Sequence, residues 1–160
     1  GNAIKKSGVS VCRRIPPVSY EIVKAKVLAV FSAYVSCAVV PELRFKEDFG
    51  DVDLLYVADP AVKVENIITS QFGVTDSELI AKHGPSVSFA VECTFAGLPN
   101  VLFQVDLIQT SSPQHLRMAS FYYSYGGLGS IIGPLFKRQH LTLSDTGLWC
   151  NLLCDAGKGR

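Results

Sequence analysis

The chain has 160 residues, 15 Lys and Arg against 14 Asp and Glu, and a formal net charge of +1. A chain of this length can bury one sizeable core, and 48% hydrophobic with 18% charged residues excludes a disordered protein or a coiled coil. The near-neutral charge argues against a protein that coats nucleic acid nonspecifically. We therefore expect a single domain over residues 1–160.

Two uncharged runs raise the question of a membrane span. Residues 27–41 number 15, fewer than the roughly 20 that a spanning helix needs. Residues 118–136 number 19, but they include four glycines, three serines and Pro134. We expect no membrane partner. Without a secretory signal pattern, we also expect reduced cysteines and an intracellular (cytoplasmic or nuclear) protein that is not secreted.

The predicted elements of the first half follow from its hydrophobic pattern. The polar, glycine-containing start indicates a flexible N-terminal tail over residues 1–15. The apolar residues of segment 20–36 form a stripe too broad for a surface helix, so we expect a largely buried helix that starts near Ser19. Next we expect strands over residues 37–40 and 52–57, then helical turns over residues 66–72 and 75–82, the second with a Thr75-x-x-Glu78 capping box.

The second half predicts a hairpin followed by two helices. Residues 87–95 and 101–108 have strand composition and flank the turn sequence Gly97-Leu98-Pro99-Asn100. After them we expect helices over residues 114–123 and 131–139 with a glycine-rich connection, apolar segments at 141–143 and 147–149, and a flexible tail over residues 151–160. Helices interleaved with a mixed, mostly antiparallel sheet make the expected fold class α+β.

Three aspartates lie within apolar strand patterns. Strand side chains alternate between faces, so Asp51 and Asp53 point the same way while the residues between and after them point into the core. Asp106 is alone among apolar residues in the strand predicted over residues 101–108. If that strand lies beside residues 52–57, three carboxylates converge, which is costly unless a cation lies among them. Such oxygen ligands favour Mg²⁺ or Mn²⁺, and two-metal sites of this kind serve phosphoryl transfer.

Structural interpretations of the same residues stay open at this point. Gly50-Asp51-Val52-Asp53 is also a common turn or cap sequence, and Asp106 could simply accept backbone hydrogen bonds. An EF-hand is excluded because apolar Leu54 and Leu55 follow, and Val62 stands where the closing Glu of that loop belongs. The cysteines and histidines lack zinc-site spacing.

Three segments occur in an order that is typical of a known superfamily. Residues 44–53 read Arg-Phe-Lys-Glu-Asp-Phe-Gly-Asp-Val-Asp, an arginine-containing turn that runs into Gly-Asp-x-Asp. Val105-Asp106-Leu107 adds a third carboxylate on a strand, and residues 141–148 follow the last predicted helix. In order and spacing, from about Tyr20 to Trp149, the chain resembles the nucleotidyltransferase superfamily, most closely the palm of family X (polymerase β-like) DNA polymerases.

This resemblance implies an activity and roles for particular residues. The activity is metal-dependent transfer of a nucleoside monophosphate from an NTP or dNTP to a hydroxyl, with a nucleic-acid 3′ end as the expected acceptor. By resemblance, Asp51 and Asp53 bind two Mg²⁺ or Mn²⁺ ions, and Asp106 completes the ion that activates the hydroxyl. The expected nucleotide-binding residues are Arg44, Gly50, Tyr123, Ser124, Tyr125 and Gly126, together with Lys46 on account of its charge and position.

The chain departs from the family pattern at two nucleotide-binding segments. Val40-Pro41 stands where the family has Gly-Ser, and Pro41 has no N–H to donate. Residues 123–127, Tyr-Ser-Tyr-Gly-Gly, replace the Thr-Gly-Ser type of segment near the nucleotide sugar. These departures favour an alternative function, a catalytically degenerate domain of the same fold that serves as a nucleic-acid-binding or assembly module.

Several other features have more than one interpretation. The chain begins Gly1-Asn2 and has one methionine, Met118, so we expect flanking domains in a larger polypeptide, with a viral origin as one hypothesis. Gly126-Gly127-Leu128-Gly129 could cradle a phosphate or form a tight turn. Three tyrosines could stack on a base or pack in the core: Tyr122, Tyr123 and Tyr125. Six basic residues could form a track for a phosphate backbone or be dispersed surface charges: Arg13, Arg14, Lys24, Lys26, Lys137 and Arg138.

Overall fold

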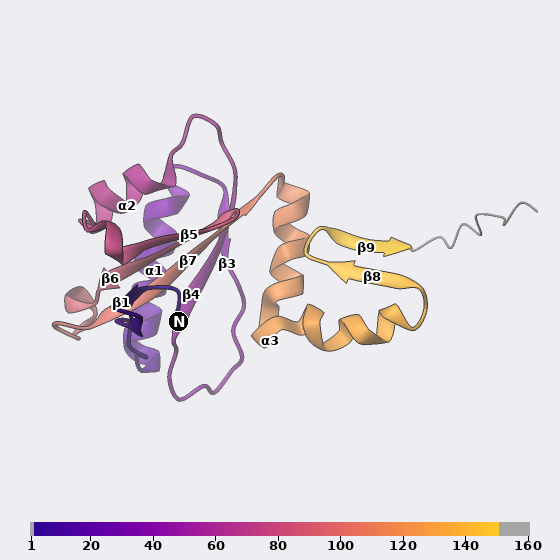
Figure 1. The fold of residues 1–160 in the computed structure, drawn as a ribbon, viewed down its shortest axis with the longest axis horizontal. Coiled ribbons are helices and arrows are strands. Elements are labelled where there is room, and N and C mark those ends of the chain that lie inside the picture. Colours follow the sequence, from indigo (N-terminus) through magenta and orange to yellow (C-terminus); the bar gives the residue numbers. More distant parts are fainter. Residues whose placement is uncertain (1, 151–160) are drawn as a thin grey trace, which may run out of the picture.

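The computed structural model describes residues 2–150, which form three α-helices, nine β-strands and two 3₁₀ turns (Figure 1). The predicted tail over residues 151–160 lies outside this part of the chain. In chain order the elements are β1 (Lys5–Lys6), β2 (Val9–Ser10), α1 (Pro17–Ser32), β3 (Cys37–Val39), β4 (Asp51–Val57), α2 (Val64–Phe72), a 3₁₀ turn (Ser77–Leu79), β5 (Ile80–His83), β6 (Ser86–Glu92), a second 3₁₀ turn (Thr94–Ala96), β7 (Leu102–Thr110), α3 (Pro113–Lys137), β8 (Leu141–Ser144) and β9 (Gly147–Cys150).

The central sheet has five strands in the order β3-β4-β7-β6-β5. β4 and β7 are parallel, whereas the other three neighbouring pairs are antiparallel, including the predicted β6–β7 hairpin. A parallel pair needs a long crossover, which α2, β5 and β6 provide between β4 and β7. The predicted α+β class with a mixed, mostly antiparallel sheet is therefore confirmed.

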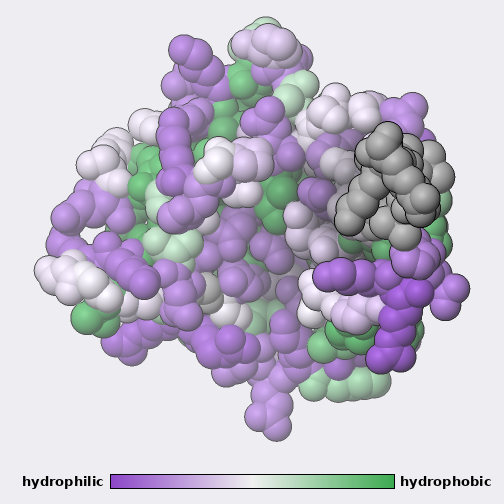
Figure 2. Space-filling model, turned by 45° about the vertical axis from the view of Figure 1, so that its right-hand side comes forward, coloured by the Kyte–Doolittle hydropathy of each residue, from purple (hydrophilic) through white to green (hydrophobic). Residues whose placement is uncertain are grey.

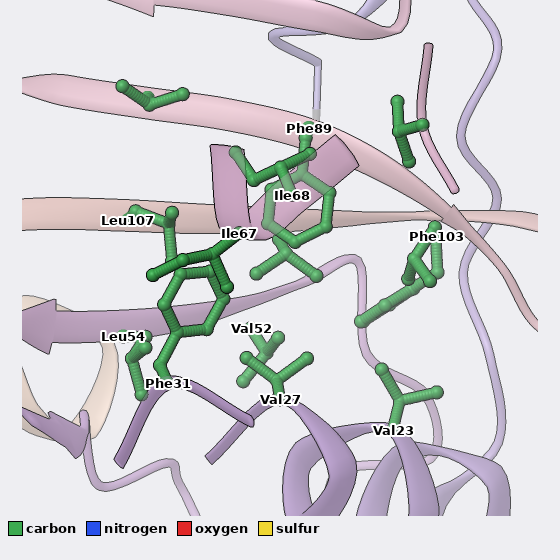
Figure 3. Close-up of a cluster of buried hydrophobic side chains, with 14 of the residues drawn as sticks. Val23, Val27, Phe31, Val52, Leu54, Ile67, Ile68, Phe89, Phe103 and Leu107 are labelled. Atoms are coloured by element: carbon green, nitrogen blue, oxygen red, sulfur yellow. The ribbon is translucent and has the colours of Figure 1, made fainter. Parts of the chain in front are cut away.

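The main hydrophobic core lies between the sheet and helices α1 and α2, which cover the same face (Figure 1). Figure 3 shows Val23, Val27 and Phe31 of α1 pointing toward the strands. Ile67 and Ile68 of α2 join the same cluster. The burial of this face leaves the opposite face of β4 and β7 available for α3 and for polar side chains.

Helix α1 begins at Pro17, two residues before the expected start, and buries only one stripe. Proline suits the first helical turn because its missing N–H would have no partner there. Ser19 is a core residue rather than a cap, and its hydroxyl donates to the Ala96 carbonyl at 3.0 Å. Val18 is 76% exposed. The expectation of a largely buried helix is wrong because only the sheet side of α1 is covered.

The N-terminal segment differs from the flexible tail expected there. β1 and β2 form a short antiparallel hairpin, and Ile4 and Ile15 are buried. The Arg13 N–H donates to the Leu102 carbonyl at 2.8 Å, and Ile15 and Phe49 exchange two backbone hydrogen bonds of 2.9 Å. The two isoleucines are too far apart to form a periodic pattern, so their burial depends on strands distant in the sequence.

Residues 75–82 do not form the expected helical turn throughout. Asp76, rather than Thr75, caps the 3₁₀ turn by accepting the Glu78 N–H at 2.9 Å. From Ile80 the chain forms β5, which pairs with β6. Strand β6 supplies the backbone hydrogen bonds that a helix would have made internally, so tertiary pairing overrides the local pattern.

Helix α3 and the β8–β9 hairpin lie on the other face of the sheet (Figure 1). Ser112 caps α3 by accepting the His115 N–H at 3.1 Å, and Ala119 packs against Leu55 of β4. Residues 124–127 have non-helical backbone angles and divide α3 into two segments, as the glycine-rich connection predicts. Within residues 2–150, no helix has both the length and the apolar character needed to cross a membrane.

Candidate active site

The three predicted carboxylates lie on neighbouring strands in the middle of the sheet. β4 and β7 pair in register, with Asp53 opposite Asp106 and Asp51 opposite Gln104. Opposed residues share a face, and neighbouring strands are about 4.8 Å apart. Leu55 packs against α3, so Asp53, two residues earlier, faces the same side. The structure therefore brings together the three aspartates that the sequence analysis selected.

Asp53 has the most perturbed carboxyl group of the three. Burial raises its pKa to about 7, and the negative charges of Asp51, Asp106 and Glu42 act in the same direction. The charge of Lys46 partly opposes this rise. A cation bound near Asp53 would therefore relieve this repulsion.

Asp106 is held by polar neighbours along the sheet. The Gln104 Nε2 atom is 2.9 and 2.8 Å from its two carboxylate oxygens, and the Ala3 N–H donates to Gln104 Oε1 at 2.9 Å. Burial raises the pKa of Asp106, while hydrogen bonds from Ser88 and Gln104 oppose the rise. Gln104 was not among the site residues predicted from the sequence, although strand alternation alone puts it on the same face as Asp106, which follows it by two residues.

The donor set suits a hard divalent cation, but the observed arrangement does not close around one. Three carboxylates on one face offer the oxygen ligands that Mg²⁺ prefers. Among residues 2–150, however, no group of three His, Cys, Asp or Glu side chains is close enough to hold a metal ion. The Gln104 amide takes both oxygens of Asp106 instead. The chemistry of the donor set suits Mg²⁺ or Mn²⁺, but a cation at Asp106 would have to compete with the Gln104 amide.

The expected triphosphate contacts lie on the loop between β3 and β4. Arg44 is exposed and makes no hydrogen bond or ion pair with any other described residue. The Lys46 Nζ atom is 2.7 Å from Glu42 Oε2 and lies over the Phe49 ring. Gly50 is buried and leads directly into β4. Arg44 is thus available for a phosphate, whereas Lys46 is engaged by Glu42.

Val40 and Pro41 offer no backbone donor at the segment where the family pattern has Gly-Ser. The Val40 N–H donates to the Asp53 carbonyl at 2.9 Å, and proline has no N–H. The Pro41 carbonyl in turn accepts the Tyr125 N–H at 2.8 Å. This last contact joins the β3–β4 loop to the break in α3.

The residues at the break in α3 are mostly committed to partners. The Tyr123 hydroxyl donates to Asp145 Oδ2 at 3.2 Å, and burial, followed by the Asp145 charge, raises its pKa to about 12. Ser124 is buried and donates to a carbonyl within α3. Tyr125 is 49% exposed, and Gly126 lies beside the β3–β4 loop. Of the predicted sugar-contacting side chains, Tyr125 is the most accessible.

A groove of 860 Å³ lies between α1 and the β3–β4 loop. Its loop wall includes Arg44 and Lys46, and its helix wall includes Tyr20 and Lys24. None of the three aspartates lines it. The groove and the carboxylates are linked through Lys46, which lines the groove and whose charge acts on Asp53.

Several cations of the predicted phosphate track have local partners. Arg14 forms an ion pair with Asp48 at 2.8 Å, and the Lys26 Nζ atom lies 3.8 Å from the centre of the Phe95 ring. On the face drawn in Figure 2, hydrophobic side chains reach the surface in separate patches among hydrophilic ones. Arg14 and Lys26 thus each contact a local partner.

Comparison with known proteins adds no assignment. No protein-family model matches the chain, and no curated protein matches it either. The resemblance carried by residues 44–53 and 105–107 stays a prediction.

Proposed function

We propose that this chain is a metal-dependent nucleotidyltransferase with a polymerase β-like palm. It would transfer a nucleoside monophosphate from an NTP or dNTP to the 3′ hydroxyl of a nucleic acid. The observation that carries the proposal is the parallel register of β4 and β7, which sets Asp53 opposite Asp106 with Asp51 on the same face. Three carboxylates on one face of a sheet repel one another, and a cation among them would offset that repulsion.

In the proposed reaction, different residues would bind the metal ions and the phosphates. Asp51, Asp53 and Asp106 would hold Mg²⁺ or Mn²⁺, which when bound supplies a more acidic acceptor hydroxyl and neutralises the leaving pyrophosphate. Arg44, exposed and without a partner in the described part of the chain, would bind the phosphates through its guanidinium fork.

The transfer itself is an in-line displacement at the α-phosphorus. The acceptor oxygen forms a bond to that phosphorus while the bond to the oxygen that bridges to the β-phosphate breaks. The electron pair of the broken bond leaves with pyrophosphate, and the hydroxyl proton passes to a carboxylate of the cluster. In the metal-free protein, burial raises the pKa of both Asp53 and Asp106.

Primer extension tests this proposal. A labelled primer, with and without template, is incubated with each nucleotide and Mg²⁺ or Mn²⁺. We expect extension by the wild type and a loss of at least about a hundredfold for Asp106→Ala, because a proton acceptor and metal ligand is removed. Asp59→Asn is the matched control, since this exposed carboxylate only caps the Ala61 N–H, and it should extend primers normally. Equal extension by wild type and Asp106→Ala would contradict the proposal.

A second candidate function is favoured by Val40 and Pro41. With the Val40 N–H bonded to the Asp53 carbonyl and no N–H at Pro41, the loop lacks the backbone donors that would cradle a triphosphate. A degenerate domain of the same fold could still bind nucleic acid or another domain of a larger polypeptide. In that case we expect no extension, but binding of a labelled oligonucleotide in fluorescence anisotropy that is unchanged by Asp106→Ala.

A further inference from the structure

The Gln104 side chain connects the N-terminal segment to the third carboxylate. Its Oε1 atom accepts the Ala3 N–H at 2.9 Å, and its Nε2 atom donates to both oxygens of Asp106. These partners determine the orientation of the amide, because a backbone N–H can only donate and an ionised carboxylate can only accept. Gln104 is 3% exposed, so the arrangement is shielded from competing water.

The Gln104 amide nitrogen occupies a position where a cation could bind Asp106. It lies 2.9 Å from one oxygen of Asp106 and 2.8 Å from the other, and so sits across the open side of the carboxylate. Asp51 is directly opposite Gln104 on β4, and Asp53 is directly opposite Asp106. The NH₂ group, with its partial positive charge, therefore lies within the row of carboxylates.

We propose that Gln104 is a latch that stands in for the cation in the metal-free protein and releases Asp106 when the metal binds. The Ala3 N–H holds the latch closed, which couples the N-terminal hairpin to the carboxylates. This inference rests on the proposed function, because it requires a metal site at Asp51, Asp53 and Asp106. Gln104 is a positioning residue, since it acts through Asp106.

The proposed latch and a merely supporting role predict opposite effects of removing Gln104 on metal affinity. A metal ion that binds Asp106 at the lone pairs the Gln104 amide now occupies would break these two hydrogen bonds, so on this proposal the bonds oppose the metal. A hydrogen bond to a charged group typically shifts an equilibrium by about tenfold or more. Removal of the amide should therefore tighten metal binding, whereas loss of a residue that merely oriented Asp106 would weaken it.

Titration of the full chain with MnCl₂ in a calorimeter tests the latch without measuring activity. We expect Gln104→Leu, which keeps the size but removes both amide groups, to bind Mn²⁺ about tenfold more tightly than the wild type. Its metal-free melting temperature should fall, because Asp106 loses a buried partner. Gln109→Leu is the matched control, since this exposed glutamine lies on the same strand away from the carboxylates and should leave Mn²⁺ affinity unchanged.

A second pair of variants tests the tie to the N-terminal segment. Ala3→Pro removes the N–H that Gln104 Oε1 accepts, while Ala3→Gly keeps it. We expect Ala3→Pro to tighten Mn²⁺ binding by several-fold, and Ala3→Gly to resemble the wild type. Should Gln104→Leu fail to fold, this pair decides the question.

The outcomes separate the latch from the proposed function. Mn²⁺ binding by the wild type that is equal or weaker in Gln104→Leu would overturn the latch and leave the metal site in place. No Mn²⁺ binding by either protein, with both folded by circular dichroism, would overturn the metal site and the latch together. Tighter binding in Gln104→Leu, abolished by Asp51→Ala with Asp53→Ala, would support both.

Discussion

At Asp53, burial and neighbouring negative charge act in the same direction, and together they raise its pKa from 3.8 to about 7. The folded protein therefore binds a proton here more tightly than the unfolded chain does. By linkage, the stabilising contribution of this proton is complete below about pH 4 and is lost as the pH rises through 7. The carboxylate that suits the proposed chemistry is thus one that destabilises the metal-free fold at neutral pH.

We expect the melting temperature of the metal-free wild type, measured in EDTA, to fall between pH 5 and pH 8. Each pKa unit corresponds to about 1.4 kcal/mol. Asp53→Asn removes this titration, so the melting temperature of the variant should depend less on pH. At pH 8 the variant should melt at a higher temperature than the wild type. Calorimetry across the pH range measures the effect, with Asp59→Asn as the control that keeps the wild-type profile. A wild-type melting temperature that rises over this range would contradict the assignment.

Among the elements, α3 is unusual because its middle is held in left-handed backbone conformations. Tyr125, Gly126 and Gly127 have φ values of 52°, 76° and 86°. This break turns the chain so that the Tyr125 N–H reaches the Pro41 carbonyl. Two of the three positions are glycines, the residues that adopt positive φ without steric strain.

A pair of glycine substitutions in α3 separates the break from the helix. Gly127→Ala puts a side chain at φ +86° and should lower the free energy of unfolding by about 1–2 kcal/mol. Gly133→Ala lies in the helical segment with open space around the added methyl group, and should raise it by up to about 1 kcal/mol. Urea denaturation followed by circular dichroism measures both. Equal effects of the two changes would argue that residues 124–127 are ordinary helix.

Across the whole molecule, the β8–β9 hairpin packs mainly against α3 in the described part of the chain (Figure 1). The Tyr123 hydroxyl and the His115 ring, both on α3, lie 3.2 and 3.6 Å from the Asp145 carboxylate at the hairpin turn. The one tryptophan of the chain, Trp149, lies on β9. Its fluorescence therefore reports on the hairpin separately from the central sheet.

We expect Tyr123→Phe to loosen the hairpin before the sheet unfolds. It removes a hydrogen bond to a charged group, which contributes about 1.5–3 kcal/mol. The denaturation midpoint from Trp149 fluorescence should then fall below the midpoint from far-ultraviolet circular dichroism. Tyr122→Phe is the matched control, because the Tyr122 hydroxyl has no hydrogen-bond partner within residues 2–150, and its two midpoints should coincide. Coincident midpoints in Tyr123→Phe would mean that the hairpin and sheet unfold as one unit.

Local sequence patterns predicted the carboxylates and most of the elements. The alternation of side chains along a strand places Asp51 and Asp53 on one face whatever lies beside them, because it is a property of the extended backbone itself. The lone Asp106 was equally visible in its apolar strand. The hairpin around Gly97 and the break near Gly126 followed from glycine, which marks turns at short range.

The tertiary structure alone decided which segments are neighbours. The parallel pairing that sets Asp53 opposite Asp106 joins strands far apart in the chain, and no local propensity encodes such a pairing. The same holds for the burial of Ile4, for β5, and for the Gln104 amide between Ala3 and Asp106. Propensities act over a few residues, whereas backbone pairing and burial depend on groups that only folding brings into contact. The sequence by itself therefore determined which residues are candidates for the proposed chemistry, and the fold determined what each of them faces.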